Sequence, residues 1–145
     1  MAQRKHRIAY LIAFSLYILA VLYLTVFRFD ARYDERRLNL SLFVDLANVY
    51  RNVGAVPFTR LFLGNIGWFV PFGFLFPVLL PAPLRRKRFL ATMAAGFVFS
   101  LLIEVTQYIF YIGVAELDDL ILNTFGVAVG YLFFHLGASE PARDK

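Results

Sequence analysis

The pattern of hydrophobic and polar positions is dominated by four long apolar stretches, at residues 8–27, 61–84, 89–113 and 117–136. A helix needs about 20 apolar residues to cross a hydrocarbon layer about 30 Å thick, and each stretch reaches that length. The first follows a basic segment, as in a signal peptide, but its apolar run exceeds the roughly 7–15 residues of signal peptides. We therefore predict four membrane-spanning helices, the first of them an uncleaved anchor.

The segment between the first two stretches, residues 28–60, has a different character. It begins with a charged run, RFDARYDERR, that we expect to be solvated. Residues 42–53, LFVDLANVYRNV, instead place apolar residues on one face at helical spacing. We predict a helix here that lies in the outer membrane interface or packs over the mouth of the bundle. No segment alternates polar and apolar residues as a half-buried strand does, so we expect no strands.

Composition agrees with this pattern. Hydrophobic residues make up 60% of the chain, against about 45–50% in soluble domains, and mean hydropathy is +0.65. The length suits one domain, residues 1–145. We predict an all-α polytopic membrane protein, a bundle of four transmembrane helices with an interfacial amphipathic helix in the first extracytoplasmic loop.

The net charge of +5 comes from short basic clusters that flank the apolar stretches. This distribution is typical of membrane orientation, and no nucleic-acid-binding motif accompanies it, so we expect no nucleic-acid partner. The N-terminal tail, the Arg-Arg-Lys-Arg block at 85–88 and the C-terminal tail share one side of a four-helix layout. Six arginines of residues 28–60 lie on the other side. The positive-inside rule, with the block at 85–88 as the strongest signal, places both termini in the cytoplasm and the protein in the cell membrane.

Polar side chains from three of the predicted helices reach a similar depth near the outer leaflet. They are Asn65, Glu104, Gln107, Asp118, Asp119 and Asn123. A helix rises about 1.5 Å per residue, which puts Asn65, Glu104 and Asn123 about 6–9 Å below the outer boundary of the hydrocarbon layer. Polar groups at such a depth face the bundle interior or a water-filled cavity. We therefore predict a small polar pocket, open to the outside, whose ligand-binding residues are Asn65, Glu104, Gln107, Asp119 and Asn123.

Small residues and prolines predict how the helices pack. Gly126 and Gly130 form a small-xxx-small pattern on the face that also carries Asp119 and Asn123, so another helix can approach this face closely. The second apolar stretch contains three prolines between residues 71 and 81. Each internal proline removes a backbone donor. We expect a kinked helix there, with a broken helix of the kind that lines transporter sites as the alternative.

Three segments stand out by their order and spacing: LGNIGWFVPFGFLFP (63–77), EVTQ (104–107) and DDLILNTFGVAVGY (118–131). Together with the helix layout, over residues 8–136, they resemble the VanZ-like family of small bacterial integral membrane proteins. RRLNLSLF (36–43) is similar to the family's Asn-Leu-x-Pro-Phe segment, with Leu42 in place of proline. Before the Asp pair the family often has Gly-Arg-x-x-Asp. This chain has IGVAELDD, so the arginine is absent and Glu116 takes the Asp position.

The resemblance implies a link to glycopeptide resistance, in particular lowered sensitivity to teicoplanin. Teicoplanin carries a lipid tail and acts at the outer surface of the cell. We therefore favour a non-enzymatic protein, embedded in the lipid bilayer, whose pocket binds an envelope lipid or glycopeptide. No cofactor and no metal are part of this hypothesis.

Other functions remain open at this point. A membrane-embedded enzyme could act on a lipid-linked envelope substrate, with Glu104 and Asp118 or Asp119 as an acid/base pair, but no nucleophile motif, histidine cluster or phosphate loop accompanies them. A transporter needs polar groups through the full membrane thickness, and the inner halves of the last three helices are almost wholly apolar. The polar residues could also serve only to join helices, at about 0.6 kcal/mol per hydrogen bond.

Overall fold

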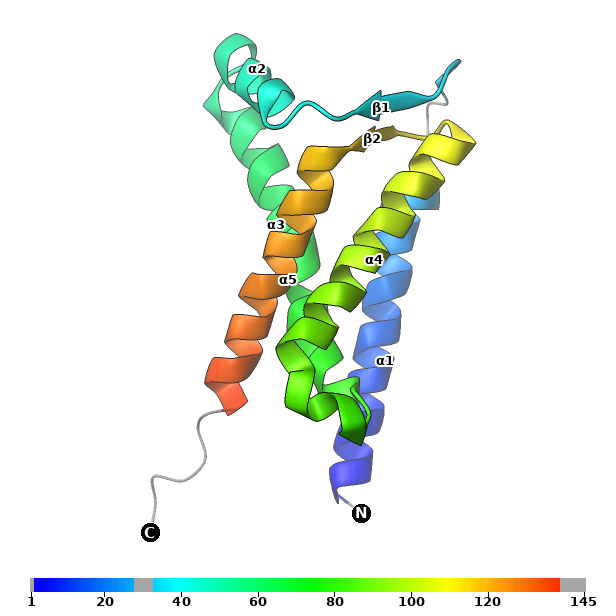
Figure 1. Cartoon of the computed structure of the whole chain (residues 1–145), viewed down its shortest axis with the longest axis vertical. Coiled ribbons are helices and arrows are strands. Elements are labelled where there is room, and N and C mark those ends of the chain that lie inside the picture. Colours follow the sequence, from blue (N-terminus) through cyan, green and yellow to red (C-terminus); the bar gives the residue numbers. More distant parts are fainter. Residues whose placement is uncertain (1, 28–32, 139–145) are drawn as a thin grey trace.

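The computed structural model describes residues 2–27 and 33–138. Four long helices form a bundle, and a short helix and two short strands lie across one end of it (Figure 1). The elements are α1 (Ala2–Leu22), the π-helix η1 (Tyr23–Phe27), β1 (Arg37–Asn39), α2 (Val44–Asn52), α3 (Ala55–Leu79), the 3₁₀-helix η2 (Ala82–Lys87), α4 (Arg88–Phe110), β2 (Val114–Glu116) and α5 (Leu117–Ala138).

The predicted all-α membrane fold is confirmed. Within the described residues, four helical segments are long and apolar enough to cross a membrane: Arg7–Phe27, Ala55–Leu79, Ala82–Phe110 and Leu117–Gly137. The charged run at the start of the 28–60 segment falls partly on residues 28–32, which lie outside the described residues.

The second spanning helix, α3, differs from the prediction at both ends. It begins at Ala55 and ends at Leu79, where we expected 61 and 84. Gly54 precedes it with a φ of 112°, a conformation that favours glycine, and Pro81 forces the residue before it out of the helical region. The prolines at 71 and 77 lie inside one continuous helix, so the broken-helix alternative is wrong.

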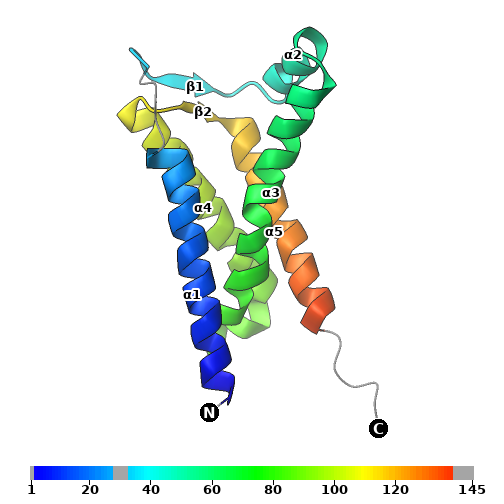
Figure 2. The same ribbon diagram turned by 180° about the vertical axis from the view of Figure 1, so that it is seen from behind.

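Two strands, β1 and β2, also contradict the prediction. They pair in parallel, with Arg37 opposite Val114 and Asn39 opposite Glu116. Each strand is three residues long, too short for an alternating pattern to be visible in the sequence. The pairing joins the segment before α2 to the segment before α5, and Figure 2 shows both strands lying across the same end of the bundle.

The amphipathic helix predicted at residues 42–53 is confirmed as α2, and it packs on the start of α3. Leu46 is its buried residue. The ring of Tyr50 meets the ring of Phe58 edge to face, with centroids 5.5 Å apart. These contacts favour the alternative in which the helix covers one end of the bundle.

The central contact of the bundle joins α3 and α5 through glycine. A Cβ added to Gly126 would collide with the Ile66 carbonyl oxygen, and one added to Gly130 would collide with that of Val70. On the other helix, a Cβ at Gly73 would strike backbone atoms of α5. The small-xxx-small prediction is therefore confirmed. A buried apolar core of Val21, Phe69, Phe72, Ile103 and Val127 lies beside this contact.

We predict that Gly73→Ala lowers the free energy of unfolding by about 1–3 kcal/mol, the usual cost of overpacking. The new methyl group would press on the backbone of α5, which cannot rotate away as a side chain can. Thermal unfolding of the purified protein in detergent, followed by the fluorescence of Trp68, measures the effect.

Gly67→Ala is the matched control, because it lies on the same helix and its Cβ would meet nothing within 4 Å. It should leave Tm unchanged or raise it slightly, since alanine favours a helix more than glycine does. Equal Tm values for the two variants would show that the glycine contact does not hold the helices together.

Candidate functional site

Carboxylates gather at the end of the bundle where β2 runs into α5. The group comprises Asp45, Glu104, Glu116, Asp118 and Asp119, five of the ten acidic residues of the chain. The charges of Asp45, Asp118 and Asp119 all act on Glu116. Glu104 is likewise within electrostatic reach of Glu116 and Asp119. We call these five residues the acidic cluster.

Asp118 fastens the segment before α2 to the start of α5. Its side chain is only 2% exposed. Both of its carboxylate oxygens accept a hydrogen bond from the backbone N–H of Phe43, with N···O distances of 2.8 and 3.0 Å. Phe43 has a φ of 55°, a left-handed conformation that is uncommon outside glycine. The charge-assisted hydrogen bond thus holds a strained residue in place.

Glu104 makes a similar connection between a helix and a strand. The residue is 6% exposed, and its carboxylate accepts a hydrogen bond from the backbone N–H of Glu116 at 2.9 Å. This bond connects α4 to the end of β2. Asp119 accepts a hydrogen bond from the side-chain amide of Asn65 and so connects α5 to α3. Asn65, Glu104 and Asp119, predicted from three separate stretches, therefore do meet at one end of the bundle.

Two other predicted residues, Asn123 and Gln107, make separate contacts. Asn123 is buried and donates to the Ser100 hydroxyl at 2.9 Å. Gln107 donates to the backbone carbonyl of Thr25 in the π-helix η1, at 3.2 Å. Both are hydrogen bonds between helices, which is the packing role that the sequence left open for polar residues.

Glu116 was recognised in the sequence as a departure from the family pattern but was not predicted as a site residue. Burial, then the negative charges of Asp119, Asp45 and Asp118, raises its pKa to about 7. Asp45 was also missed. It accepts a hydrogen bond from Asn39 at 2.6 Å, and Asn39 pairs with Glu116 across the strands. The strand pairing, which has no sequence signal, is what brings these residues to the site.

An apolar groove of about 440 Å³ lies between α2 and α3. It is lined by Phe43, Leu46, Ala47, Tyr50, Phe58 and Phe62. Phe43 lines this groove, and its backbone N–H donates a hydrogen bond to Asp118. The α2–α3 groove therefore directly adjoins the acidic cluster.

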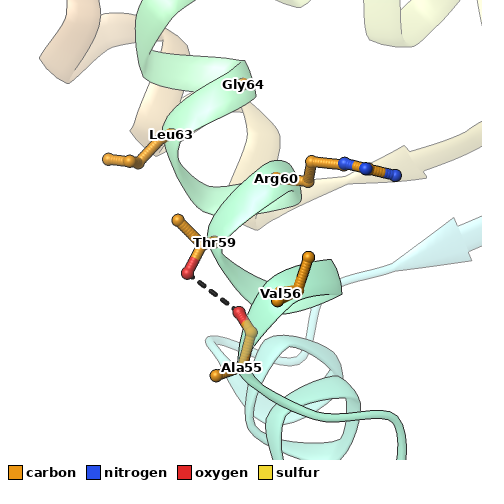
Figure 3. A pocket seen from close by; sticks show the side chains of 6 residues that line it. All are labelled: Ala55, Val56, Thr59, Arg60, Leu63 and Gly64. Carbon is orange, nitrogen blue, oxygen red and sulfur yellow. Dashed lines mark hydrogen bonds between the residues drawn. The ribbon is translucent and has the colours of Figure 1, made fainter.

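A second depression, of about 560 Å³, follows the first turns of α3. Figure 3 shows its lining, from Ala55 to Gly64, with the Thr59 hydroxyl donating to the Ala55 carbonyl oxygen at 2.8 Å. The acidic cluster contributes none of the six residues that line it. We therefore do not include this depression in the candidate site.

The described part of the chain contains no candidate metal site. There, no three His, Cys, Asp or Glu side chains converge in an arrangement that could hold a metal ion. The hydrogen-bond partners found for four of the five carboxylates are backbone amides and asparagine side chains. These four carboxylates of the cluster therefore already accept hydrogen bonds from donors of the protein itself.

Comparison with known proteins gives a consistent answer. The sequence profile of the VanZ/LLP1 family matches residues 14–138. Protein VanZ from Enterococcus faecium is 30% identical over 137 residues, which cover 90% of this chain and 76% of that protein. No solved structure shows significant similarity.

We predict that Glu116→Gln flattens the dependence of Tm on pH. The folded protein holds the Glu116 proton up to about pH 7, whereas an unfolded chain releases it near the ordinary pKa of 4.5. Between these two values the folded state binds more protons, so the stability that Glu116 contributes is lost as the pH rises through the window. Thermal unfolding in detergent at pH values across the window gives the slope.

Glu35→Gln, which removes an exposed carboxylate outside the cluster, serves as the control and should keep the slope of the wild type. An unchanged slope in Glu116→Gln would mean that this carboxyl group titrates alike in the folded and unfolded states.

Proposed function

The chain belongs to the VanZ/LLP1 family, and we propose that it is a single-domain membrane protein that binds a lipid-tailed component of the cell envelope and thereby lowers sensitivity to teicoplanin. The binding site in this proposal combines the α2–α3 groove with the acidic cluster. The role is one of binding and not of catalysis.

The observation that carries the proposal is the double role of Phe43. The residue lines an apolar groove, and its backbone N–H donates to a buried carboxylate of the adjoining cluster. The apolar lining of the groove suits a lipid tail, because a tail held there covers apolar side chains at the end of the bundle that would otherwise be exposed. The carboxylate and amide oxygens beside it accept hydrogen bonds from hydroxyl and ammonium groups, which suits the polar part of such a ligand.

A second function, hydrolysis or transfer at a lipid-linked envelope substrate, is supported by one observation. Glu104 is buried and lies within electrostatic reach of Asp119, and two coupled carboxyl groups are a common acid/base arrangement. Turnover of a lipid-linked envelope precursor by the purified protein, abolished by Glu104→Gln, would establish this function in place of the binding role.

The proposal requires the acidic cluster to face the outside of the cell, with both termini in the cytoplasm. The block of basic residues at 85–88 supports this orientation through the positive-inside rule. The chain contains no cysteine, so single cysteines can report the side of the membrane.

We predict that Ser41→Cys reacts with a membrane-impermeant maleimide in intact cells, because residue 41 lies beside the acidic cluster. Lys87→Cys should react only after the cells are permeabilised. Both side chains are exposed in the structure, so access is set by the membrane. The reverse labelling pattern would invert the orientation and remove the proposed access of an outer ligand.

We predict that Glu104→Gln combined with Asp119→Asn abolishes protection against teicoplanin. Expressed in a sensitive host at the membrane level of the wild type, the double variant should lower the inhibitory concentration to that of cells with an empty vector. A groove variant, Ala47→Phe, should have the same effect, because the larger ring fills the space assigned to the tail.

The control is Asp34→Asn with Glu35→Gln, which removes the same number of carboxylates from exposed positions outside the cluster. It should protect as well as the wild type. Full protection by the Glu104 and Asp119 double variant would disprove the role of the cluster.

A further inference from the structure

The end of the bundle opposite the acidic cluster carries a pocket of opposite charge. It has a volume of about 390 Å³ and is lined by residues 85–90 and Tyr131. Four of these residues are consecutive cations, Arg85, Arg86, Lys87 and Arg88. They lie on the turn between α3 and α4, at the end where α1 begins and α5 finishes (Figure 1). We call this site the basic pocket.

Local structure explains why the cations converge. Leu80 and Pro81 end α3 in extended conformations, and Pro83 fits the first turn of η2. The 3₁₀-helix η2 then presents three of the cations in its last turn, and the fourth begins α4. Arg7 lies at the same end, where it donates to the carbonyl oxygen of Leu79 at 3.3 Å.

Within the described residues, no carboxylate is available to neutralise these charges. The acidic residues there occupy positions 34–45 and 104–119, towards the other end of the bundle. Residue 104 is separated from residue 88 by about 24 Å of helix, by the usual rise per residue. Four adjacent cations repel one another, and an anion bound among them would relieve this repulsion.

One residue of the pocket lining, Arg88, also has a buried polar atom that lacks a partner. In the described part of the chain, the buried side-chain nitrogen and oxygen atoms without a hydrogen-bond partner are Arg88 Nε and Thr92 Oγ1. The two residues are four apart on α4 and therefore share one face of that helix. The guanidinium of Arg88 lies over the ring of Phe134, 5.6 Å from its centroid, which fixes the side chain beside the pocket. Orphaned buried groups of this kind point to a missing partner.

We propose that the basic pocket binds the phosphate headgroup of an anionic phospholipid in the leaflet on the side of the chain termini. Arginine guanidinium groups match phosphate oxygens in geometry as well as in charge. A lipid fits the site better than a free phosphate does, because the apolar side chains of Phe89 and Leu90 line the same pocket and are exposed on a helix long and apolar enough to span a membrane. The cations also follow directly on a spanning helix, which is the level of the headgroups. This binding is independent of the outer-leaflet function proposed above.

The test is the binding of phosphatidylglycerol to the purified protein in a neutral detergent, measured by native mass spectrometry and by the rise in Tm. Phosphatidylcholine and inorganic phosphate are tested in parallel. We expect saturable binding of phosphatidylglycerol and little or none of the other two. Arg85→Gln with Arg86→Gln should weaken that binding roughly 25-fold, at roughly fivefold for each basic residue. Both side chains are exposed, so the variant should fold as the wild type does.

Arg51→Gln with Arg60→Gln is the matched control, because it removes two exposed arginines from the other end of the molecule. It should bind phosphatidylglycerol as the wild type does. Arg88→Lys keeps the charge but loses the planar set of guanidinium donors, and it should weaken the binding of phosphatidylglycerol.

Three results would overturn the proposal. Equal binding of phosphatidylcholine would mean that the pocket does not read the headgroup charge. Equal weakening by the control variant would mean that net charge, and not this pocket, attracts the lipid. A saturable rise in Tm with inorganic phosphate alone would assign the site to a free phosphate.

Discussion

The close approach of α3 and α5 along Gly73, Gly126 and Gly130 is the contact on which the remaining geometry depends. In a hydrocarbon layer, helices gain nothing from leaving lipid for protein, so association relies on tight packing and on hydrogen bonds between helices. Glycine supplies the tight packing, because the backbone of one helix reaches the backbone of the other. The same pair of helices then brings Asn65 to Asp119 at the end of the bundle that carries the acidic cluster. Val127, fully buried between the helices, packs against Gly96 of α4 and extends the contact to a third helix.

The acidic cluster is held together in an unusual way for a group of like charges. Carboxylates this close repel one another, and buried charges normally need a cation or a proton. Here backbone N–H groups supply part of the compensation, because Phe43 donates to Asp118 and Glu116 donates to Glu104. Asp118 and Asp119 also occupy the first turn of α5, where the helix dipole favours negative charge. The first of these hydrogen bonds connects the β1–α2 segment to α5, and the second connects β2 to α4. The cluster therefore stabilises the arrangement of these segments.

The sequence was informative wherever a long periodic signal existed. The four spanning helices, the amphipathic α2 and the glycine face of α5 follow from length, periodicity and residue size, and all three are present in the structure. Depth counting along the helices also brought Asn65, Glu104 and Asp119 to one end. Depth alone does not fix the direction in which a side chain points around its helix. It therefore did not predict that Gln107 bonds to Thr25 and Asn123 to Ser100.

What the sequence did not reveal depends on loops. The parallel pairing of β1 with β2 joins residues 37–39 to residues 114–116, and neither segment is long enough to carry a pattern. That pairing, with the left-handed Phe43, brings Asp45 and Glu116 into the cluster and sets α2 against α3. The start of α3 was misplaced for a related reason, because Gly54 permits the chain to turn directly from α2 into the spanning helix. Local backbone conformation, and not hydrophobicity, decides these features.

Charge is segregated along the axis of the bundle, and this segregation bears on function. One end carries the acidic cluster and the other end carries the basic pocket. Between them lies a core of Val21, Phe69, Phe72, Ile103 and Val127. The deepest of the predicted polar contacts, between Asn123 and Ser100, is a neutral pair already satisfied by its own hydrogen bond. An ion or polar solute crossing this core would find few groups to replace its water, at the high cost of desolvation in an apolar medium. Within the described residues, the charged groups are therefore concentrated at the two ends of the bundle, and the buried polar side chains between them, Thr92, Ser100 and Asn123, are neutral.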